Sequence, residues 1–383
     1  MKKICIVTGT RAEYGLLKPV IERILTEPEL KLYLVATGMH LAPEFGLTYK
    51  EIEQDGIIID EKVEILLSSD TNAGMTKSTG LAMLAFADYF ARKRPDMLLV
   101  LGDRFEIFAV AAAAAMAEIP IAHLYGGDTT EGAVDEFFRH SITKMSYLHF
   151  TATKQYKKRV EQLGESPDRV FYVGALGVEN ILNVKLLTRQ ELEDSIGFQL
   201  DQAYALVTFH PATMEADDAE EQFRQLLEAI DQFEQMKFLF TKANSDAKGR
   251  AINRMLDDYV AERENCAAYP SLGMRRYLSA MKYAAMVIGN SSSGLYETPS
   301  FKIPTINIGD RQRGRIQADS VINCEPAMEK IFQAIQEGLV KDCSNTTNPY
   351  QGVSPSQDIV RMVKKCLLED KIDLKKTFWD ITV

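Results

Sequence analysis

The sequence predicts an α/β protein built from two halves, each with a parallel β-sheet covered by helices on both faces. Short apolar runs alternate with longer amphipathic runs along a chain of 383 residues. Strands that alternate with helices in this way form parallel sheets. The alternation pauses at the small residues 173–177 and then restarts. The chain length also corresponds to two domains, at roughly 150 residues per domain.

Each expected element of the first half follows from its pattern. A strand is a short apolar run, and a helix is a longer run with apolar residues three and four positions apart. The helix that ends at Lys93 stops there because Pro95 disfavours helical backbone just before it. We therefore expect strands at 4–7, 32–36, 63–66, 97–101 and 119–124, and helices at 16–25, 76–93, 105–117 and 136–145.

The second half repeats the pattern, with strands at 203–209, 237–241, 286–288 and 305–308 and helices at 219–233, 247–260, 275–285 and from 295 onward. A last helix covers 354–368, and the aromatic residues of the tail beyond it indicate that the tail packs on the protein. We expect two Rossmann-like domains, with the C-terminal helix crossing back to the first. The first domain is residues 1–176, completed by 368–383, and the second is residues 177–367.

Composition excludes several classes of partner. The formal net charge is −10, whereas nucleic acids and anionic membranes select basic surfaces. The five cysteines are scattered without a Cys-x-x-Cys pair, which indicates reduced thiols and neither a disulfide framework nor a zinc site. The apolar run at the N-terminus is too short for a signal peptide, and no run is long enough to span a membrane. We expect a soluble, cytoplasmic protein.

Candidate functional residues follow the strands, because parallel sheets bind ligands at the carboxyl ends of their strands. After the first strand, Gly9 permits a tight turn, the next helix offers free N–H groups, and Arg11 offers guanidinium donors suited to a diphosphate. An ordinary strand–helix turn is the alternative. The turn is not a complete Gly-x-Gly-x-x-Gly motif, so it does not indicate a nicotinamide site.

Carboxylates follow the later strands of the first half. Asp103 comes directly after a strand, and Asp128 and Asp135 lie in the loop after His123. Several carboxylates in one loop are unfavourable unless they are paired or used. The structural alternatives are that Asp103 and Asp135 cap helices and that His123 is a hydrogen-bonded core residue.

Donors suited to phosphate follow the strands of the second half. His210 precedes a proline that stops its strand, and Asn244 follows the next strand. The segment 289–294 combines glycines with three serines before Glu297, and Arg311 belongs to the most basic loop of the chain. The serines could equally be plain helix caps, and the basic loop a solvated turn. Carboxylates in one half and phosphate donors in the other are typical of an enzyme that binds a nucleotide sugar in a cleft between two domains.

Several long segments carry a family resemblance: TGTRAEYGLLKPV, VLGDRFEIFAVA, HLYGGDTTEGAVDEFFRH, FHPAT, IGNSSSGLYE and INIGDRQRGR. Through these, the chain resembles the hydrolysing UDP-N-acetylglucosamine 2-epimerases of bacterial sialic-acid-type pathways, essentially end to end. The resemblance implies the two-domain fold of the B-type glycosyltransferases. It also implies an enzyme without metal or other cofactor that forms a homodimer or homotetramer.

The reaction that the resemblance implies converts UDP-N-acetylglucosamine and water into N-acetylmannosamine and UDP. Departure of UDP gives C1 oxocarbenium character, so that the C2 hydrogen becomes abstractable and a 2-acetamidoglucal forms. Water then adds at C1, and C2 is protonated from the opposite face. The reaction that the resemblance implies thus requires acid/base groups around the sugar ring and donors around the leaving diphosphate.

The family motifs also imply residue roles. The catalytic candidates are Asp103, Asp128, Asp135 and His210. The candidates for binding the UDP-sugar are Arg11, Arg104, Tyr125, Asn244, Ser291, Ser292, Ser293, Gly294, Glu297 and Arg311. Two positions depart from the family pattern, which commonly has Glu at Asp128 and often has His or Glu at Tyr125. Tyrosine is a poor base at neutral pH, with an ordinary pKa of about 10.

These departures leave alternatives open. The same chemistry on a UDP-2,4-diacetamido-2,4,6-trideoxy sugar of a legionaminic-type pathway would fit an altered sugar pocket. A non-hydrolysing epimerase would return UDP to C1 and release none. A UDP-sugar-binding protein without turnover would bind UDP only, and a glycosyltransferase would need an acceptor other than water.

Overall fold

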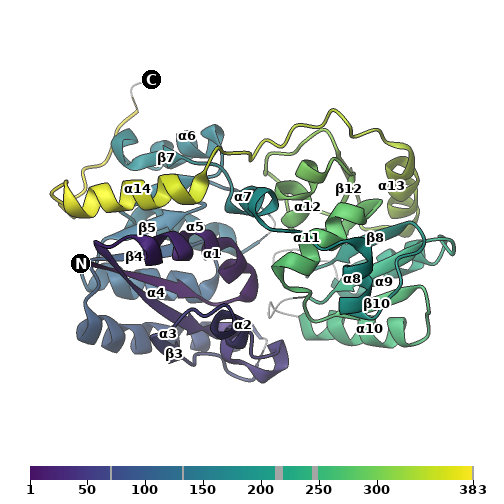
Figure 1. Cartoon of the computed structure of the whole chain (residues 1–383), viewed down its shortest axis with the longest axis horizontal. Coiled ribbons are helices and arrows are strands. Elements are labelled where there is room, and N and C mark those ends of the chain that lie inside the picture. Colours follow the sequence, from purple (N-terminus) through teal and green to yellow (C-terminus); the bar gives the residue numbers. More distant parts are fainter. Residues whose placement is uncertain (70, 132, 212–218, 244–248, 382–383) are drawn as a thin grey trace. The chain divides into compact units, whose positions relative to one another are not determined.

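The structure, a computed structural model, describes residues 1–69, 71–131, 133–211, 219–243 and 249–381 (Figure 1). It contains two parallel sheets, one of seven strands and one of six. Each sheet belongs to its own compact unit. The first unit is Met1–Asp128, Asp135–Asn180 and Tyr350–Val383, and the second is Thr129–Val134 and Ile181–Pro349. The expected α/β class with two parallel sheets is confirmed.

The first sheet has the strand order β3-β2-β1-β4-β5-β6-β7. Its central strand β4 is apolar along its whole length because helices cover both faces of the sheet. The strands are β1 (Lys2–Thr8), β2 (Leu30–Thr37), β3 (Glu61–Val63), β4 (Met97–Leu101), β5 (Ile121–Leu124), β6 (Leu148–Thr151) and β7 (Val170–Tyr172).

Alternate residues of β1 point to opposite faces of this sheet. Ile4 and Ile6 belong to one buried cluster, together with side chains of α1 and α14. Cys5 and Val7 belong to another, together with side chains of α3, α4 and α5. This is the two-residue period of a strand buried on both sides. The helices of the unit are α1 (Arg11–Thr26), α2 (Tyr49–Gln54), α3 (Asn72–Lys93), α4 (Phe105–Met116), α5 (Asp135–Met145), α6 (Lys154–Gln162), α7 (Leu176–Asn183) and α14 (Pro355–Leu368).

The C-terminal segment crosses back to the first unit, but it does so earlier than residue 368. The return begins at Tyr350, whose hydroxyl lies 3.1 Å from that of Tyr156 in the core. The backbones of Gly174 and Gly352 then approach so closely that a Cβ on Gly174 would lie 2.4 Å from the Gly352 Cα. The whole of α14 therefore packs on the first unit, against α1 (Figure 1).

The tail beyond α14 is anchored at one point of the first unit. The Lys376 ammonium donates to both carboxylate oxygens of Glu165, which also contacts His149. The ring of Phe378 covers Gly164, because a Cβ there would lie 2.3 Å from it. The backbone N–H of Trp379 donates to the Gly164 carbonyl oxygen over 2.9 Å. The ring of Phe378 therefore contacts the first unit while its side chain stays 64% exposed, and Trp379 is held there through its backbone.

The second sheet has the strand order β10-β9-β8-β11-β12-β13. Its strands are β8 (Tyr204–Thr208), β9 (Lys237–Thr241), β10 (Cys266–Tyr269), β11 (Met286–Gly289), β12 (Thr305–Ile308) and β13 (Val321–Cys324). Its helices are α8 (Arg189–Ile196), α9 (Ala219–Ile230), α10 (Gly249–Ala261), α11 (Gly273–Tyr283), α12 (Ser293–Tyr296) and α13 (Met328–Val340). The helix expected from 295 onward is a single turn, because Pro299 lies in the 3-10 helix that follows it.

Each sheet has one point where the strand order reverses. In the first sheet the chain runs outward in one direction from β1 and in the other direction from β4, and these two strands are neighbours. In the second sheet β8 and β11 have the same relation. Helices diverge to opposite faces at such a point, so the carboxyl ends of these four strands are the expected ligand-binding positions. Among the described residues, no helix is long and apolar enough to cross a membrane.

Candidate active site

A carboxylate cluster lies beyond β4 in the first unit and is organised by one buried arginine. Arg139, on α5, is 1% exposed. Its Nε donates to Asp103 Oδ2 over 2.8 Å, and one Nη contacts Glu136 and the Asp128 carbonyl oxygen. His140 Nε2 lies 3.0 Å from the other oxygen of Glu136. A buried guanidinium requires such anionic partners. We call Asp103, Glu136, Arg139 and His140 the Arg139 cluster.

Asp103 does not cap α4, contrary to the structural alternative. The residue at the cap position is Arg104, whose side chain makes no capping hydrogen bond. The carboxylate of Asp103 instead turns to Arg139 and remains 21% exposed. A carboxylate that is held by a buried cation and still reaches solvent can contact a ligand. Arg139 and Glu136 were not among the expected site residues. Their own pair has the i,i+3 spacing of a helix, whereas the Asp103–Arg139 pair, 36 positions apart, has no local sequence signal.

The loop after β5 is fixed by its backbone. Gly127 has φ 81°, and a Cβ there would lie 2.4 Å from the Tyr156 carbonyl oxygen, so only glycine fits. Tyr125 has φ 70°. Its hydroxyl oxygen accepts from the Leu176 N–H over 2.8 Å, which is a structural contact at the start of α7. Asp128 is buried at the end of the loop, and Asp135 begins α5.

His123 is a hydrogen-bonded core residue, which was one of the two interpretations that the sequence left open. Its Nε2 lies 2.8 Å from the Gly102 carbonyl oxygen and its Nδ1 lies 3.2 Å from the Thr143 hydroxyl. Burial lowers the pKa of His123 to about 3. The neutral ring therefore ties the end of β5 to the start of the loop that carries Asp103.

The turn after β1 is a capping box, which changes how a phosphate could bind there. Thr10 caps α1, and its side chain accepts from the Glu13 N–H. The Glu13 carboxyl accepts from the N–H groups of Gly9 and Thr10 over 2.7 and 3.2 Å. These two N–H groups already have acceptors, so Arg11 is the more accessible donor at this turn. The Arg11 guanidinium lies 3.7 Å from Glu51 and is 23% exposed on its side chain.

Arg104, at the N-cap position of α4, supports this turn. Its Nε donates to Glu106 Oε1 over 2.8 Å. Glu106 is buried against Gly9, where a Cβ would lie 2.7 Å from it. Burial and the charge of Glu106 raise the pKa of Glu13 to about 8. Arg104 therefore contacts a buried carboxyl pair rather than open solvent alone.

In the second unit, Asn290 holds the ends of β8 and β11 together. Its side-chain oxygen accepts from the His210 N–H and its amide donates to the His210 carbonyl oxygen, both over 2.7 Å. The Asn290 carbonyl oxygen accepts from Arg311 and Gln312 over 3.2 and 2.7 Å. Asn290 thus fixes His210 and Arg311 together. It was not an expected site residue, because the pairing becomes visible only once β8 and β11 are known to be neighbours.

The serine segment follows β11. The Ser293 hydroxyl lies 2.5 Å from the Tyr277 hydroxyl and 3.2 Å from that of Ser291. Because α12 has one turn, it has little macrodipole, and the hydroxyls are the main donors here. Gly294 packs on β12, where a Cβ would lie 2.7 Å from the Thr305 methyl. Burial raises the pKa of Glu297, at the end of the turn, to about 8, although Arg315 opposes this shift.

The arginines of the loop after β12 have different partners. Arg311 contacts Asn290, as described, and Arg315 donates to the Thr129 carbonyl oxygen over 3.1 Å. Arg313 is exposed and pairs with Glu131 and Asp310. The loop is therefore only partly solvated: Arg313 is exposed, whereas Arg311 and Arg315 bind backbone carbonyl oxygens. Asn244 lies outside the described residues.

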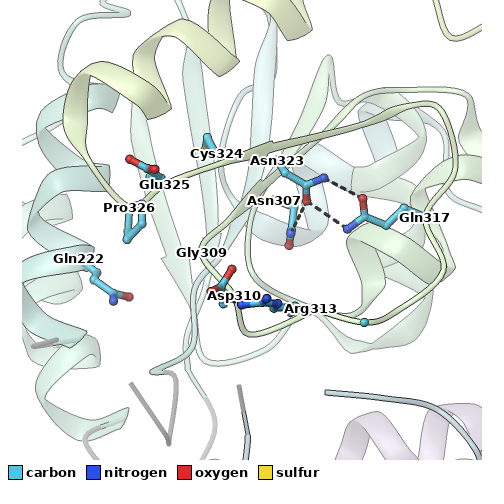
Figure 2. A pocket seen from close by; sticks show the side chains of 11 residues that line it. Gln222, Asn307, Gly309, Asp310, Arg313, Gln317, Asn323, Cys324, Glu325 and Pro326 are labelled. Carbon is cyan, nitrogen blue, oxygen red and sulfur yellow. Dashed lines mark hydrogen bonds and ion pairs between the residues drawn. The ribbon is translucent and has the colours of Figure 1, made fainter. Parts of the chain in front are cut away.

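A pocket of about 600 Å³ opens beside this loop, at the carboxyl ends of β12 and β13 (Figure 2). Figure 2 shows an amide network on one wall, where Asn323 bonds to both Asn307 and Gln317. Asp310 and Arg313 lie on the side of the loop. The lining is polar, which suits a hydroxylated ligand more than an apolar one. Within the described ranges, His, Cys, Asp and Glu side chains form no group that could hold a metal ion.

Together, these residues provide two kinds of chemistry at the reversal points of the two sheets. The first unit presents carboxylates that can accept or donate protons. The second presents hydroxyls, a guanidinium and a histidine that can bind and stabilise a diphosphate.

Sequence comparison identifies relatives along the whole chain. The family model of UDP-N-acetylglucosamine 2-epimerase matches residues 22–364. A Campylobacter jejuni protein named GDP/UDP-N,N'-diacetylbacillosamine 2-epimerase (hydrolyzing) is 42% identical over 99% of both chains. The Escherichia coli polysialic acid biosynthesis protein P7 is 40% identical over 100% of this chain and 98% of its own. A Legionella pneumophila UDP-N,N'-diacetylbacillosamine 2-epimerase (hydrolyzing) is 32% identical over 97% and 98%.

Solved structures share the fold. The UDP-GlcNAc 2-epimerase of Methanocaldococcus jannaschii, in complex with UDP-GlcNAc and UDP, has a TM-score of 0.80 and is 20% identical over 94% of this chain and 99% of its own. A putative UDP-N-acetylglucosamine 2-epimerase of Listeria monocytogenes has a TM-score of 0.80 and is 19% identical over 99% of both chains. The chain belongs to the UDP-N-acetylglucosamine 2-epimerase family.

Proposed function

We propose that this protein is a hydrolysing 2-epimerase that releases UDP and a free sugar with inverted configuration at C2. The observation that carries the proposal is the Asp103–Arg139 pair, in which a buried arginine presents a solvent-reaching carboxylate at the reversal point of the first sheet. Binding of UDP alone requires no proton acceptor, whereas a carboxylate that reaches solvent can serve as one. The curated relatives of this chain with the word "hydrolyzing" in their names support the release of UDP.

The second unit would bind the nucleoside diphosphate. Ser291, Ser292 and Arg311 donate to the phosphates, with Ser293 and Gly294 shaping the segment. Glu297, whose pKa lies near neutrality, can both donate to and accept from the ribose hydroxyls. His210, fixed by Asn290, stabilises the charge that develops on the leaving diphosphate.

The first unit would carry the proton transfers. As UDP departs, C1 gains oxocarbenium character and one of the carboxylates Asp103, Asp128 and Asp135 accepts the C2 proton. Water adds at C1 of the resulting glucal, and a second group returns a proton to the opposite face of C2. Arg11 and Arg104 would support the anionic part of the substrate. Tyr125 would act on the loop rather than on the sugar, since its hydroxyl already binds Leu176.

The sugar that the comparisons favour is N,N'-diacetylbacillosamine, a 2,4-diacetamido-2,4,6-trideoxy sugar. The names of two full-length relatives, including the one at 42% identity, specify this substrate. Asp128, at a position where the family commonly has Glu, fits a modified pocket. UDP-N-acetylglucosamine, with N-acetylmannosamine as product, is the second candidate, since the family model has that name. We place the enzyme in the cytoplasm, where its five free cysteines would stay reduced.

The test is incubation of the protein with each UDP-sugar, and with the GDP-linked bacillosamine, followed by proton and phosphorus NMR. We expect free UDP and free 2-epimerised sugar in equal amounts. An epimerised UDP-sugar with no free UDP would indicate the non-hydrolysing reaction. Product that requires an added acceptor would indicate a glycosyltransferase, and UDP binding without any turnover would refute enzymatic activity.

A further inference from the structure

The two peptide groups that flank the buried Asp128 are each held by an arginine. Before Asp128, the Gly127 carbonyl oxygen accepts from Arg159 Nη1 over 2.7 Å. After it, the carbonyl oxygen of Asp128 itself accepts from Arg139 Nη1 over 3.0 Å. Each peptide group is planar, so holding the carbonyls on both sides fixes both backbone dihedrals of Asp128. The direction in which its side chain leaves the backbone is then fixed as well.

A third arginine holds the next carbonyl along the chain. Arg315 Nε donates to the Thr129 carbonyl oxygen over 3.1 Å. Gly314, directly before Arg315, has φ 85°, and a Cβ there would lie 2.7 Å from the Thr129 hydroxyl oxygen. Glycine therefore allows the loop after β12 to come this close. Three consecutive carbonyls thus accept from guanidinium groups of three separate elements, and such charge-assisted bonds are stronger than neutral ones.

Arg159 has no other polar side-chain contact among the residues that the structure describes. It lies on α6, half-buried, with its guanidinium 5.3 Å from the centre of the Tyr156 ring. An arginine on a helix surface is usually solvated or paired with a carboxylate. The bond to Gly127 is therefore the specific contact of this side chain, and its effect falls on the backbone beside Asp128.

We propose that Arg159 and Arg315 are positioning residues, which fix the backbone on either side of Asp128 so that its carboxylate can exchange a proton with C2 of the sugar. The inference rests on the proposed 2-epimerase reaction and deepens it. Aspartate has one methylene group between backbone and carboxylate, so a displacement of the backbone moves the carboxylate oxygens almost as far. A displacement of about 1 Å costs a proton transfer much of its rate.

The first experiment measures steady-state kinetics and UDP binding of Arg159→Gln. We expect kcat to fall about tenfold to a hundredfold, with KM and the calorimetric Kd for UDP within about threefold, since no phosphate donor is touched. Arg275→Gln is the matched control, because Arg275 also donates to one distant carbonyl, that of Lys185, over 2.8 Å. It should keep the wild-type kcat. Arg315→Gln should lower kcat too, but Arg315 shares its loop with Arg311, so Arg159 is the cleaner test.

The second experiment asks whether Arg159 acts through Asp128. In the background of Asp128→Asn, which has already lost the proton-transferring carboxylate, Arg159→Gln should lower the remaining kcat less than threefold. A residue that only stabilised the fold would lower kcat by the same factor in both backgrounds. Equal factors, or a wild-type kcat for Arg159→Gln alone, would overturn the proposal.

The third experiment measures positioning without turnover. Amide hydrogen exchange, followed by mass spectrometry, should be faster in peptides that cover residues 126–130 of Arg159→Gln than in the wild type, and unchanged there in Arg275→Gln. A wild type that releases no UDP would refute the proposed function. A wild type that does release UDP, together with unchanged exchange in Arg159→Gln, would refute the positioning role alone.

Discussion

Replacing Glu13 by Gln should remove a loss of folding stability that the buried Glu13 carboxyl causes as the pH rises. Glu13 and Glu106 are buried together, and among the described residues one carboxyl oxygen of each makes no hydrogen bond. Two adjacent buried carboxyls cannot both ionise at low cost. Burial first, and then the charge of Glu106, raise the pKa of Glu13 from 4.5 to about 8. Glu13 therefore keeps its proton at neutral pH in the folded protein.

The sign and size of the effect follow from this shift. The folded state binds more protons than the unfolded state between the two pKa values, so the contribution of Glu13 to stability is complete below about pH 4.5 and is lost as the pH rises toward 8. At 1.36 kcal/mol per pKa unit, the loss has an upper limit of about 5 kcal/mol. Gln has the shape of protonated Glu, can still accept from the N–H groups of Gly9 and Thr10, and does not titrate.

The assay is urea unfolding of wild type and Glu13→Gln, followed by circular dichroism at pH 5 and pH 8. We expect similar free energies of unfolding at pH 5 and a variant more stable by a few kcal/mol at pH 8. Glu193→Gln is the matched control, because Glu193 is as buried as Glu13 and also accepts a backbone N–H, from Leu200 in the second unit. A Glu13→Gln variant that becomes relatively less stable between pH 5 and pH 8 would refute the reasoning, since it would mean that folding needs the ionised carboxylate.

Three further predictions concern the site. Asp103→Asn should abolish turnover while UDP binding, measured by calorimetry, stays within about threefold, because the variant loses a proton acceptor and no phosphate donor; turnover at the wild-type rate would exclude Asp103 as a catalytic group. Product formed in heavy water should carry deuterium at C2 by NMR, and product with only protium there would contradict the elimination route. Tyr125→Phe should cost about 1 kcal/mol of stability by removing the acceptor of the Leu176 N–H, yet keep most of the activity; complete inactivation of a folded variant would show that the hydroxyl acts on the substrate.

The sequence predicted the strands that carry the candidate site better than the elements at the edges of the sheets. β4 and β12 have the bounds expected from the sequence, and every residue of both strands is buried. β13 was missed, since its residues Val321–Cys324 alternate between buried and exposed positions and include a polar Asn323. β6, β7 and β10 were missed for a related reason, because each is a short strand whose apolar run is interrupted or brief. Three of these four strands lie at the edge of their sheet, and β6 is an interior strand of only four residues, so none gives a long apolar run.

The loop in which a candidate residue lies was easier to predict than the side chain that it contacts. Asp103 was expected in the right loop, but its capping role and its pairing with Arg139 could not be separated, because Arg139 lies 36 positions further along the chain. The return of α14 to the first unit also involves residues that are far apart in the sequence. It depends on the contact of Tyr350 with Tyr156, which are 194 positions apart. Such contacts are fixed by tertiary packing rather than by local pattern.

Sheet order explains why the candidate residues lie in two turns of each unit. In the first unit, Gly9 follows β1 and Asp103 follows β4, and in the second, His210 follows β8 and Asn290 follows β11. Both pairs of strands are neighbours at the reversal point of their sheet. In the second unit the approach is so close that a Cβ on Gly289 would lie 1.9 Å from the Thr208 carbonyl oxygen. Any side chain there would force β8 and β11 apart and would break the Asn290 bonds that hold His210. The glycine therefore serves the candidate site through the backbone, and Gly289→Ala should lower both stability and UDP affinity.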